Sequence, residues 1–261
     1  MSRSRFGGFR KGRKRYFNNW SILKSEDVAA PETVADLDYS KAKGIWNLKS
    51  TTQFPKNQIP AFSASYVTST SVGSTGSSYT FSSVNIGAAD SYRTVAVTVS
   101  WNAGNFNRLL SSATIGGVSA TLLQTSAAAG WERSAIIYAS VPSGTTANIA
   151  LNFNGTIAYG IAIGVFRLIN VTTVTSPVYN AHNNTTTTYT TNISVNAGDY
   201  VISALGVGNG VANWTNTTER YSYTKSSDYL EGASTTAATT GTLSVSSTGS
   251  TYGVLTTVAF R

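Results

Sequence analysis

Hydrophobic and polar residues alternate along most of the sequence after residue 60. Val95, Val97, Val99 and Trp101 alternate with small or polar residues, and a period of two is typical of a strand with one buried face. Further alternating or β-rich runs occur at residues 79–81, 135–138, 149–153, 161–165, 189–195, 200–205, 243–245 and 254–260. This region contains no stretch of ten or more residues with a helical period. The pattern predicts an all-β region.

Turn-forming residues separate these runs, at Gly116-Gly117 and at residues 142–144, 154–155, 196–199 and 247–249. A strand with one apolar face needs an opposing face to bury it against. We therefore expect residues 61–261 to form an antiparallel β-sandwich or jelly-roll-like domain of two packed sheets.

The composition supports this class of fold. Of the 261 residues, 11% are charged, against about 25% in a typical globular domain, so Ser, Thr, Asn and Gly must cover the surface. The chain has no cysteine, which excludes disulfides and thiolate metal sites. No stretch resembles a signal peptide or reaches the roughly 18 apolar residues of a membrane span. We expect synthesis and assembly in a host cytoplasm, without a membrane partner.

The positive charge is concentrated at the start of the chain. Residues 1–56 hold twelve of the nineteen basic residues and five of the eleven acidic ones, a net charge of +7, which leaves +1 for residues 57–261. We interpret residues 1–25 as a basic N-terminal arm. Seven of its cationic side chains lie within the first fifteen residues, interleaved with glycines and aromatic residues, and Trp20 follows them. They are Arg3, Arg5, Arg10, Lys11, Arg13, Lys14 and Arg15.

Three interpretations of this arm compete. The first is a solvated tail, the usual state of so dense a run of like charges. The second is nucleic-acid binding, in which guanidinium groups pair with phosphates and aromatic rings stack on bases. The third is docking on an acidic surface of a neighbouring protein subunit, with the aromatic residues as anchors. A terminus is ordered only where a partner holds it, and we favour protein as that partner, with nucleic acid as the alternative.

Residues 26–60 predict an extended linker, because acids and bases alternate and Pro31, Pro55 and Pro60 interrupt the segment. Its apolar centre is Gly44-Ile45-Trp46-Asn47-Leu48, and we assign Trp46 to the anchoring residues. With the Gln53-Phe54 pair that follows, this segment resembles the short Gly-Val-Trp-x-Leu segment that precedes variable β-domains in structural proteins of tailed phages, especially marine ones.

A longer resemblance covers about half of the β-region. It rests on Ile115-Gly116-Gly117-Val118, on the Pro-x-Gly-Thr turn at residues 142–145, and on Gly164-Val165-Phe166-Arg167-Leu168. Together these resemble a β-module found in phage structural and fibre-like proteins. The resemblance implies a virion structural protein on capsid or tail, such as a decoration, fibre or adhesin-like element. Its partners would be other virion proteins and copies of itself in a symmetric homo-oligomer such as a trimer.

The residues that could support catalysis are few. His182 is the only histidine and lies in a polar segment, which predicts a solvated loop residue. Cleavage of a glycan needs two facing carboxylates, and the candidate pairs are Asp228 with Glu231 and Glu132 with Asp199. However, Glu132 adjoins Arg133 and Glu219 adjoins Arg220, which predicts surface charge pairs, while Asp90 and Asp199 lie where Asp caps turn amides. We predict no enzyme, and no catalytic, cofactor or metal site.

Aromatic residues of the last third lie among serines and threonines, as in surfaces that contact glycans or proteins. The candidates are Trp214, Tyr221, Tyr223 and Tyr229, with core or sheet-edge placement as the alternative for each. Two other functions remain open for the whole chain. One is a coat protein of a small icosahedral virus whose arm binds the genome, and the other is a glycan-binding module.

Overall fold

The computed structural model describes residues 59–261, except residues 105–107, 127–130, 183–187, 210–212, 226–227 and 250–251. The arm and most of the linker therefore lie outside the described residues, together with all the predicted anchoring residues from Arg3 to Trp46. The described part is antiparallel β-structure without a helix, which confirms the predicted fold class. Within it, no helix is long and apolar enough to span a membrane.

The described strands fall into two halves of the sequence. Those of the first half are β1 (Ser63–Val72), β2 (Gly76–Asn85), β3 (Arg93–Asn102), β4 (Leu110–Ile115), β5 (Val118–Ser119), β6 (Thr121–Gln124), β7 (Glu132–Ser140), β8 (Thr146–Ile157) and β9 (Ile161–Ile169). Those of the second half are β10 (Val178–His182), β11 (Thr188–Val195), β12 (Tyr200–Gly208), β13 (Thr218–Lys225), β14 (Asp228–Thr236), β15 (Gly241–Thr248) and β16 (Gly253–Phe260).

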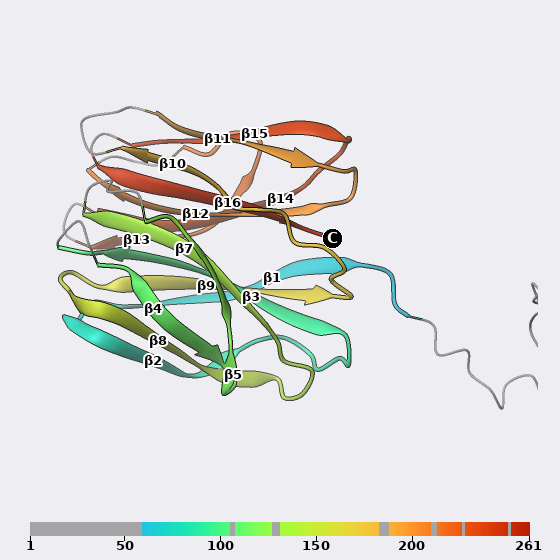
Figure 1. The fold of residues 1–261 in the computed structure, drawn as a ribbon, viewed down its shortest axis with the longest axis horizontal. Coiled ribbons are helices and arrows are strands. Elements are labelled where there is room, and N and C mark those ends of the chain that lie inside the picture. Colours follow the sequence, from blue (N-terminus) through green and yellow to red (C-terminus); the bar gives the residue numbers. More distant parts are fainter. Residues whose placement is uncertain are drawn as a thin grey trace, which may run out of the picture. The chain divides into compact units, whose positions relative to one another are not determined.

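The strands form four layers, where the sequence predicts two packed sheets (Figure 1). Each half contributes an outer and an inner sheet. The first half has the outer sheet β2-β8-β4-β5 and the inner sheet β1-β9-β3-β7-β6, and the second has the inner sheet β10-β16-β12-β14-β13 and the outer pair β11-β15. The two inner sheets pack face to face, because strands of one half contact strands of the other across them, as β3 contacts β12 and β7 contacts β16.

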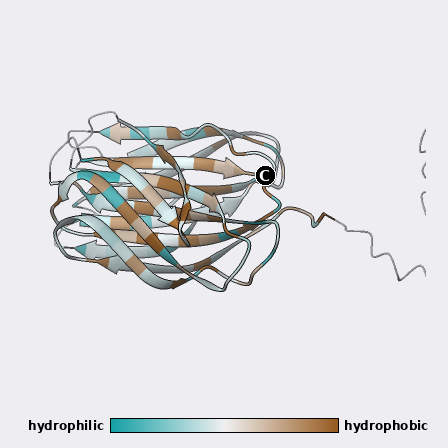
Figure 2. Cartoon of the chain, turned by 60° about the horizontal axis from the view of Figure 1, so that its bottom comes forward, coloured by the Kyte–Doolittle hydropathy of each residue, from teal (hydrophilic) through white to brown (hydrophobic). Residues whose placement is uncertain are grey.

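The double burial of the inner sheets explains this difference. On β3, Val97 and Val99 face the core of the first half, as the alternation predicts. The intervening Thr98 and Ser100 are also buried, because they face the second half. Thr98 Oγ1 hydrogen-bonds Tyr221 Oη at 2.9 Å, and Ser100 Oγ donates to the Glu231 carbonyl at 3.3 Å. Hydrophobic positions thus alternate with hydrophilic ones even along strands inside the stack (Figure 2).

The same strand topology occurs twice. Strands β1, β9, β3, β7 and β6 lie in the order in which β10, β16, β12, β14 and β13 lie in the other half, and the β2-β8 pair corresponds to β11-β15. Across the interface β9 faces β14 while β7 faces β16, which is the arrangement of an approximate twofold axis parallel to the strands. Among its described residues the second half has no counterpart of β4 and β5. At the corresponding edge of β15, Thr215 forms a single isolated bridge with Ser246.

Local features repeat with the topology. Tyr79-Thr80 and Tyr189-Thr190 occupy the corresponding strands β2 and β11. In each half an aspartate in the turn before the central strand meets an arginine at the end of the last strand. Arg167 Nη2 lies 3.8 Å from Asp90 Oδ2, and Arg261 Nε lies 3.9 Å from Asp199 Oδ1. The chain therefore contains one β-unit in two copies.

The stack has two ends of different character (Figure 1). We name one end the attachment end, because residues 1–58 join the described part of the chain there; it holds Pro60, whose carbonyl accepts a hydrogen bond from Asn170, and the C-terminal Arg261. The opposite end, on the left of Figure 1, holds the starts of β7, β9 and β16, and we name it the loop end. Between the halves, the interface near the attachment end is aromatic, with Phe166 lying 6.3 Å from Tyr200 and Tyr138 lying 5.8 Å from Phe260, ring centre to ring centre. Toward the loop end the interface becomes polar.

Arg93 ties together the turns of the first half at the attachment end. It is fully buried. Its guanidinium donates hydrogen bonds of 2.7–2.9 Å only to backbone carbonyl oxygens, those of Val141, Gly87, Ala88, Ser143 and Gly144. These bonds satisfy the cation without a carboxylate and fix the loops on either side of β3.

Two predicted turns differ in the structure. Asn154-Gly155 lies inside β8, where Asn154 pairs with Leu109 through both its backbone and its side chain. Gly155 leaves room for Arg108, whose Nη1 would lie 2.4 Å from a Cβ at this position. Ser247 and Thr248 likewise belong to β15. In both places a partner across the sheet outweighs the local preference of Asn-Gly and Ser-Thr-Gly for a turn.

Candidate functional site

Buried acidic groups join the two halves near the loop end. The Asn102 side-chain amide, at the end of β3, donates to Glu132 Oε1 on β7 at 3.3 Å and to Asp228 Oδ2 on β14 at 2.5 Å. Glu132 is 3% exposed and Asp228 is 8% exposed. Since Asp228 belongs to the second half, this amide connects the halves where their interface is polar. We name these three residues the acid bridge.

The surroundings of Glu132 favour its protonated form. Burial, and then the nearby charge of Asp228, raise the pKa of Glu132 to about 8. Among the described residues Glu132 Oε2 has no hydrogen-bond partner, and a buried carboxylate in that condition is costly in its charged form. The acid bridge therefore contains one neutral carboxyl group, and its stability depends on pH.

The predicted carboxylate pairs do not form. Asp199 lies at the attachment end beside Arg261, far along the strands from Glu132. Asp228 and Glu231 are three residues apart on β14, so they point to opposite faces of the inner sheet. The structure thus brings together a pair that the sequence did not suggest, Glu132 with Asp228, and it buries both groups within the interface between the halves.

The predicted surface charge pairs are also wrong. Glu132 and Arg133 are both buried, and Arg220 donates from Nε to Ser234 Oγ at 2.8 Å. Adjacent residues on a strand point to opposite faces, which explains why neighbours in sequence do not pair. The predicted turn caps are confirmed: Asp90 Oδ1 accepts a hydrogen bond from the Tyr92 amide at 2.8 Å, and Asp199 Oδ2 accepts one from the Asn196 amide at 2.7 Å.

His182 is not a loop residue. It is the last residue of β10, it is half-buried, and its ring packs edge-on against Tyr189 at 5.4 Å. Among the described residues, no group of three or more His, Cys, Asp or Glu side chains is arranged to hold a metal ion.

Trp214 covers a second buried acid. Its indole Nε1 donates to Glu231 Oε2 at 2.9 Å, and Ser222 Oγ donates to Glu231 Oε1 at 2.8 Å. Burial raises the pKa of Glu231 to about 7, although both hydrogen bonds favour the charged form. The half-buried indole is thus held inside the second half, with its polar edge on a carboxyl group.

The other predicted contact residues also face inward to a large extent. Tyr221 is only 6% exposed, and its ring lies between Gly164 and Gly232, where added Cβ atoms would come within 2.2 and 2.3 Å of it. Burial removes Tyr221 from the predicted contact surface. Tyr223 and Tyr229 are half-buried, Tyr223 hydrogen-bonding Ser69 at 3.2 Å and Tyr229 packing on the core of the second half.

Three other aromatic side chains are exposed, and all lie at the loop end. They are Trp131 (46% exposed), Tyr159 (49%) and Tyr252 (40%), and we name them the aromatic rim. Each immediately precedes or lies within two residues of a strand, β7, β9 and β16 respectively. The rings of Trp131 and Tyr252 come from different halves and stack at 6.5 Å with an angle of 24° between their planes.

The signal for two rim residues is present in the sequence. Tyr159-Gly160 and Tyr252-Gly253 repeat the same dipeptide before the last strand of each half. A Cβ on Gly160 would lie 2.5 Å from the Val72 carbonyl oxygen, and one on Gly253 would lie 2.6 Å from that of Gly206. Each glycine therefore presses against a neighbouring strand. Recognising this signal requires the repeat to be known first.

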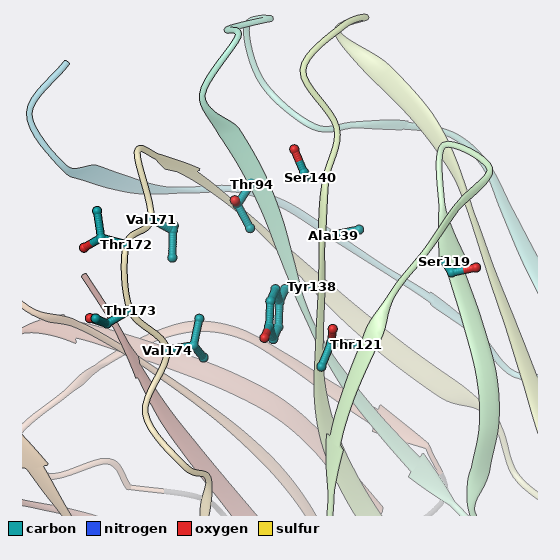
Figure 3. Close-up of a pocket in the computed structure, with 10 residues that line it drawn as sticks. All are labelled: Thr94, Ser119, Thr121, Tyr138, Ala139, Ser140, Val171, Thr172, Thr173 and Val174. Carbon is teal, nitrogen blue, oxygen red and sulfur yellow. The ribbon is translucent and has the colours of Figure 1, made fainter. Parts of the chain in front are cut away.

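A pocket of about 300 Å³ opens between the end of β7 and residues 171–174, in the segment that joins the halves (Figure 3). Tyr138 lies at its centre, with Val171 and Val174 on one side. The remaining lining residues are Thr94, Ser119, Thr121, Ala139, Ser140, Thr172 and Thr173. The lining offers Ser, Thr and Tyr hydroxyl groups but no acidic, imidazole or charged side chain that could activate them.

Comparison with known proteins adds no family to this description, since no protein-family model, curated protein or solved structure matches the chain.

Proposed function

We propose that the chain is a structural, non-enzymatic component of a bacteriophage virion, a decoration, fibre or adhesin-like protein attached through residues 1–58. The observation that carries this proposal is that the described chain starts at the end of the stack opposite the aromatic rim, where the Pro60 carbonyl accepts a hydrogen bond from Asn170 and Ser63 pairs with Ile169. Residues 1–58 are joined to that end, so attachment through them leaves the loop end free to face outward.

The build of the stack supports such a role. Strands of both inner sheets run from one end to the other and are buried on both faces, which makes the stack a stiff spacer. Residues 57–261 carry a net charge of only +1. Among the described residues, the carboxyl groups of Glu132 and Asp228, which share the Asn102 amide, are buried between the halves and do not face a substrate groove. These features favour shape and surface over catalysis.

Incorporation into particles tests the proposal. Full-length chains would carry Arg10, Lys11, Arg13, Lys14 and Arg15 all replaced by Gln, and a matched control would carry Lys41→Gln and Lys43→Gln in the linker. Immunoblots of purified particles would give the amount of chain per particle. We expect the arm variant to fall more than tenfold and the control to match the wild type. Absence of the wild-type chain from purified particles would overturn the proposal.

The coat protein of a small icosahedral virus is the second candidate, favoured by the density of positive charge in the arm. In that case the arm neutralises the genome, and binding of the full-length chain to nucleic acid weakens steeply with salt. The same arm variant separates the two functions. Loss of packaged genome at unchanged protein content favours the coat protein, whereas loss of the chain from intact, filled particles favours the attached virion protein.

A further inference from the structure

We infer that the aromatic rim formed by Trp131, Tyr159 and Tyr252 is a binding surface for a neutral glycan. It is the part of the described chain where large aromatic side chains reach solvent. The described residues expose only five large hydrophobic side chains, and the two outside the rim, Ile59 and Val118, are aliphatic. Exposed aromatic rings offer flat apolar faces, and in Tyr and Trp a polar edge as well.

The rim is held in place by its backbone. The Trp131 carbonyl accepts a hydrogen bond from the Ala103 amide at 2.5 Å, and the Tyr252 carbonyl accepts one from the Gly208 amide at 3.0 Å. The residues on either side of Tyr159 both bond the backbone of Asn102. The Ala158 amide donates to the Asn102 carbonyl at 3.2 Å, and the Asn102 amide donates to the Gly160 carbonyl at 3.3 Å. The backbone around all three residues is therefore hydrogen-bonded to the loop-end termini of the central strands β3 and β12. A fixed ring loses little conformational freedom when a ligand binds.

The charged residues that flank the Trp131–Tyr252 pair are buried, whereas Lys225 is exposed near Tyr159, with its Nζ beside Gly73, the neighbour of Gly160. Glu132 and Arg133 directly follow Trp131 in sequence, but both are buried. Asp228 is also buried, in the acid bridge. A protein partner usually adds arginine or other charged contacts around aromatic anchors, and a nucleic acid requires cations. A stacked aromatic pair with buried carboxyl groups behind it, and with the single lysine Lys225 near Tyr159, fits the C–H faces of neutral sugar rings, with hydroxyl groups at the ring edges.

The stacked pair gives the surface a geometry that can be tested. Trp131 and Tyr252 are supplied by different halves, and their near-parallel rings lie 6.5 Å apart. Both must be present to form the pair, so either substitution should weaken binding. Tyr159 comes from the loop of the first half that corresponds to that of Tyr252, so its contribution tests whether both copies of the Tyr-Gly step take part.

Binding of neutral oligosaccharides by the full-length chain tests the inference. A glycan array would be followed by titration with the neutral ligands that bind, with maltohexaose, cellohexaose and chitohexaose as soluble probes and a hexamer of polygalacturonate as the acidic contrast. We expect at least one neutral oligosaccharide to bind, and Trp131→Ala or Tyr252→Ala to weaken it at least tenfold. Trp131→Phe and Tyr252→Phe keep a ring and should retain most of the affinity.

The control variant is Val118→Ala, which trims an exposed hydrophobic side chain elsewhere on the same half. It should bind as the wild type does, and circular dichroism should show all variants folded, because the altered side chains are exposed. Absence of binding to every neutral glycan would overturn the inference, and so would binding that survives the double variant Trp131→Ala with Tyr252→Ala. Either result leaves the attachment proposal standing, since that rests on the arm variants.

Discussion

The two halves share a strand order, but their outer layers and their cores differ. In the first half a four-stranded outer sheet covers the inner sheet, and Trp101, packed 5.2 Å from Phe153, lies at the centre of a large apolar core. In the second half the outer layer is the β11-β15 pair, and two small apolar clusters share the interior with Glu231 and Trp214. One strand order therefore accommodates an apolar filling in one copy and a partly polar one in the other.

The largest difference between the halves should appear at Arg93. Arg93→Met removes a buried cation that satisfies five carbonyl groups, and it should lower the free energy of unfolding by about 4 kcal/mol. The second-half comparison is Arg261→Met, whose side chain is 53% exposed and should matter by less than about 1 kcal/mol. Urea unfolding at pH 7 measures both. Equal effects of the two substitutions would show that the loops of the first half do not depend on Arg93.

The buried acids should make stability fall as pH rises. Both Glu132 and Glu231 have pKa values raised above the unfolded value of about 4.5, so the folded state retains protons that the unfolded state has lost. Each group therefore makes the free energy of unfolding fall as the pH rises above 4.5, by no more than about 1.4 kcal/mol per pH unit. The fall ends at about pH 7 for Glu231 and at about pH 8 for Glu132.

Two variants divide this pH effect between the halves. Glu132→Gln should abolish the decline in stability between pH 7 and 8, because Gln keeps the acceptor for Asn102 and does not ionise. Glu231→Gln should flatten the curve only below about pH 7. Urea unfolding from pH 5 to 8.5 gives these slopes. A decline between pH 7 and 8 that persists in Glu132→Gln would show that Glu132 is already ionised in the folded protein.

The packing between the halves should be sensitive to a single methyl group. Gly164→Ala places a Cβ 2.2 Å from the Tyr221 ring and 2.8 Å from Thr98 Oγ1, and it should cost about 2 kcal/mol. Gly155→Ala is the matched control on the adjacent sheet: the three atoms nearest to its Cβ all belong to the long side chain of Arg108, which can shift, so it should cost less than about 1 kcal/mol. Thermal melts compare the pair, and equal melting temperatures would mean that Tyr221 can move aside.

The smallest effects should come from the repeated Asp–Arg contacts. Asp90 and Arg167 are both partly exposed and lie 3.8 Å apart, so Arg167→Gln should cost about 0.5 kcal/mol, and less in high salt. Asp199 is buried, so Asp199→Asn should cost more than Asp90→Asn, by about 1 kcal/mol. Unfolding curves at low and high salt make this comparison. An equal loss for both aspartate variants would show that the two copies of the contact are equivalent.

The sequence predicts the class of the fold and many of its strands, because apolar residues on β3, β8 and β9 alternate over uninterrupted runs. It does not predict β1 or β13, which are rich in Ser, Thr and Tyr and carry little apolar signal. It also does not predict the interface between the two inner sheets, because Thr98 and Ser100 are small polar residues that resemble exposed positions until a partner sheet covers them.

The candidate site is harder to predict than the fold. The aspartate turn caps follow from local sequence, and the structure confirms them. The acid bridge depends on Glu132 and Asp228, which are far apart in sequence and meet only because two halves pack on each other. Tyr221 is buried because Gly164 and Gly232 make room for its ring, and Trp131 is exposed because nothing in the described part of the chain covers it fully. Such placements depend on tertiary contacts.

Residues 170–177 join the two halves in one chain, and this connection affects how strongly the halves associate. Two separate subunits would have to overcome the loss of their free movement before an interface formed, and an interface with a buried acid is poorly suited to that. Within one chain the short connection holds the halves at a high effective concentration, so even a weak interface remains closed at any dilution. The acid bridge can therefore vary in strength with pH without any change in the number of chains that associate.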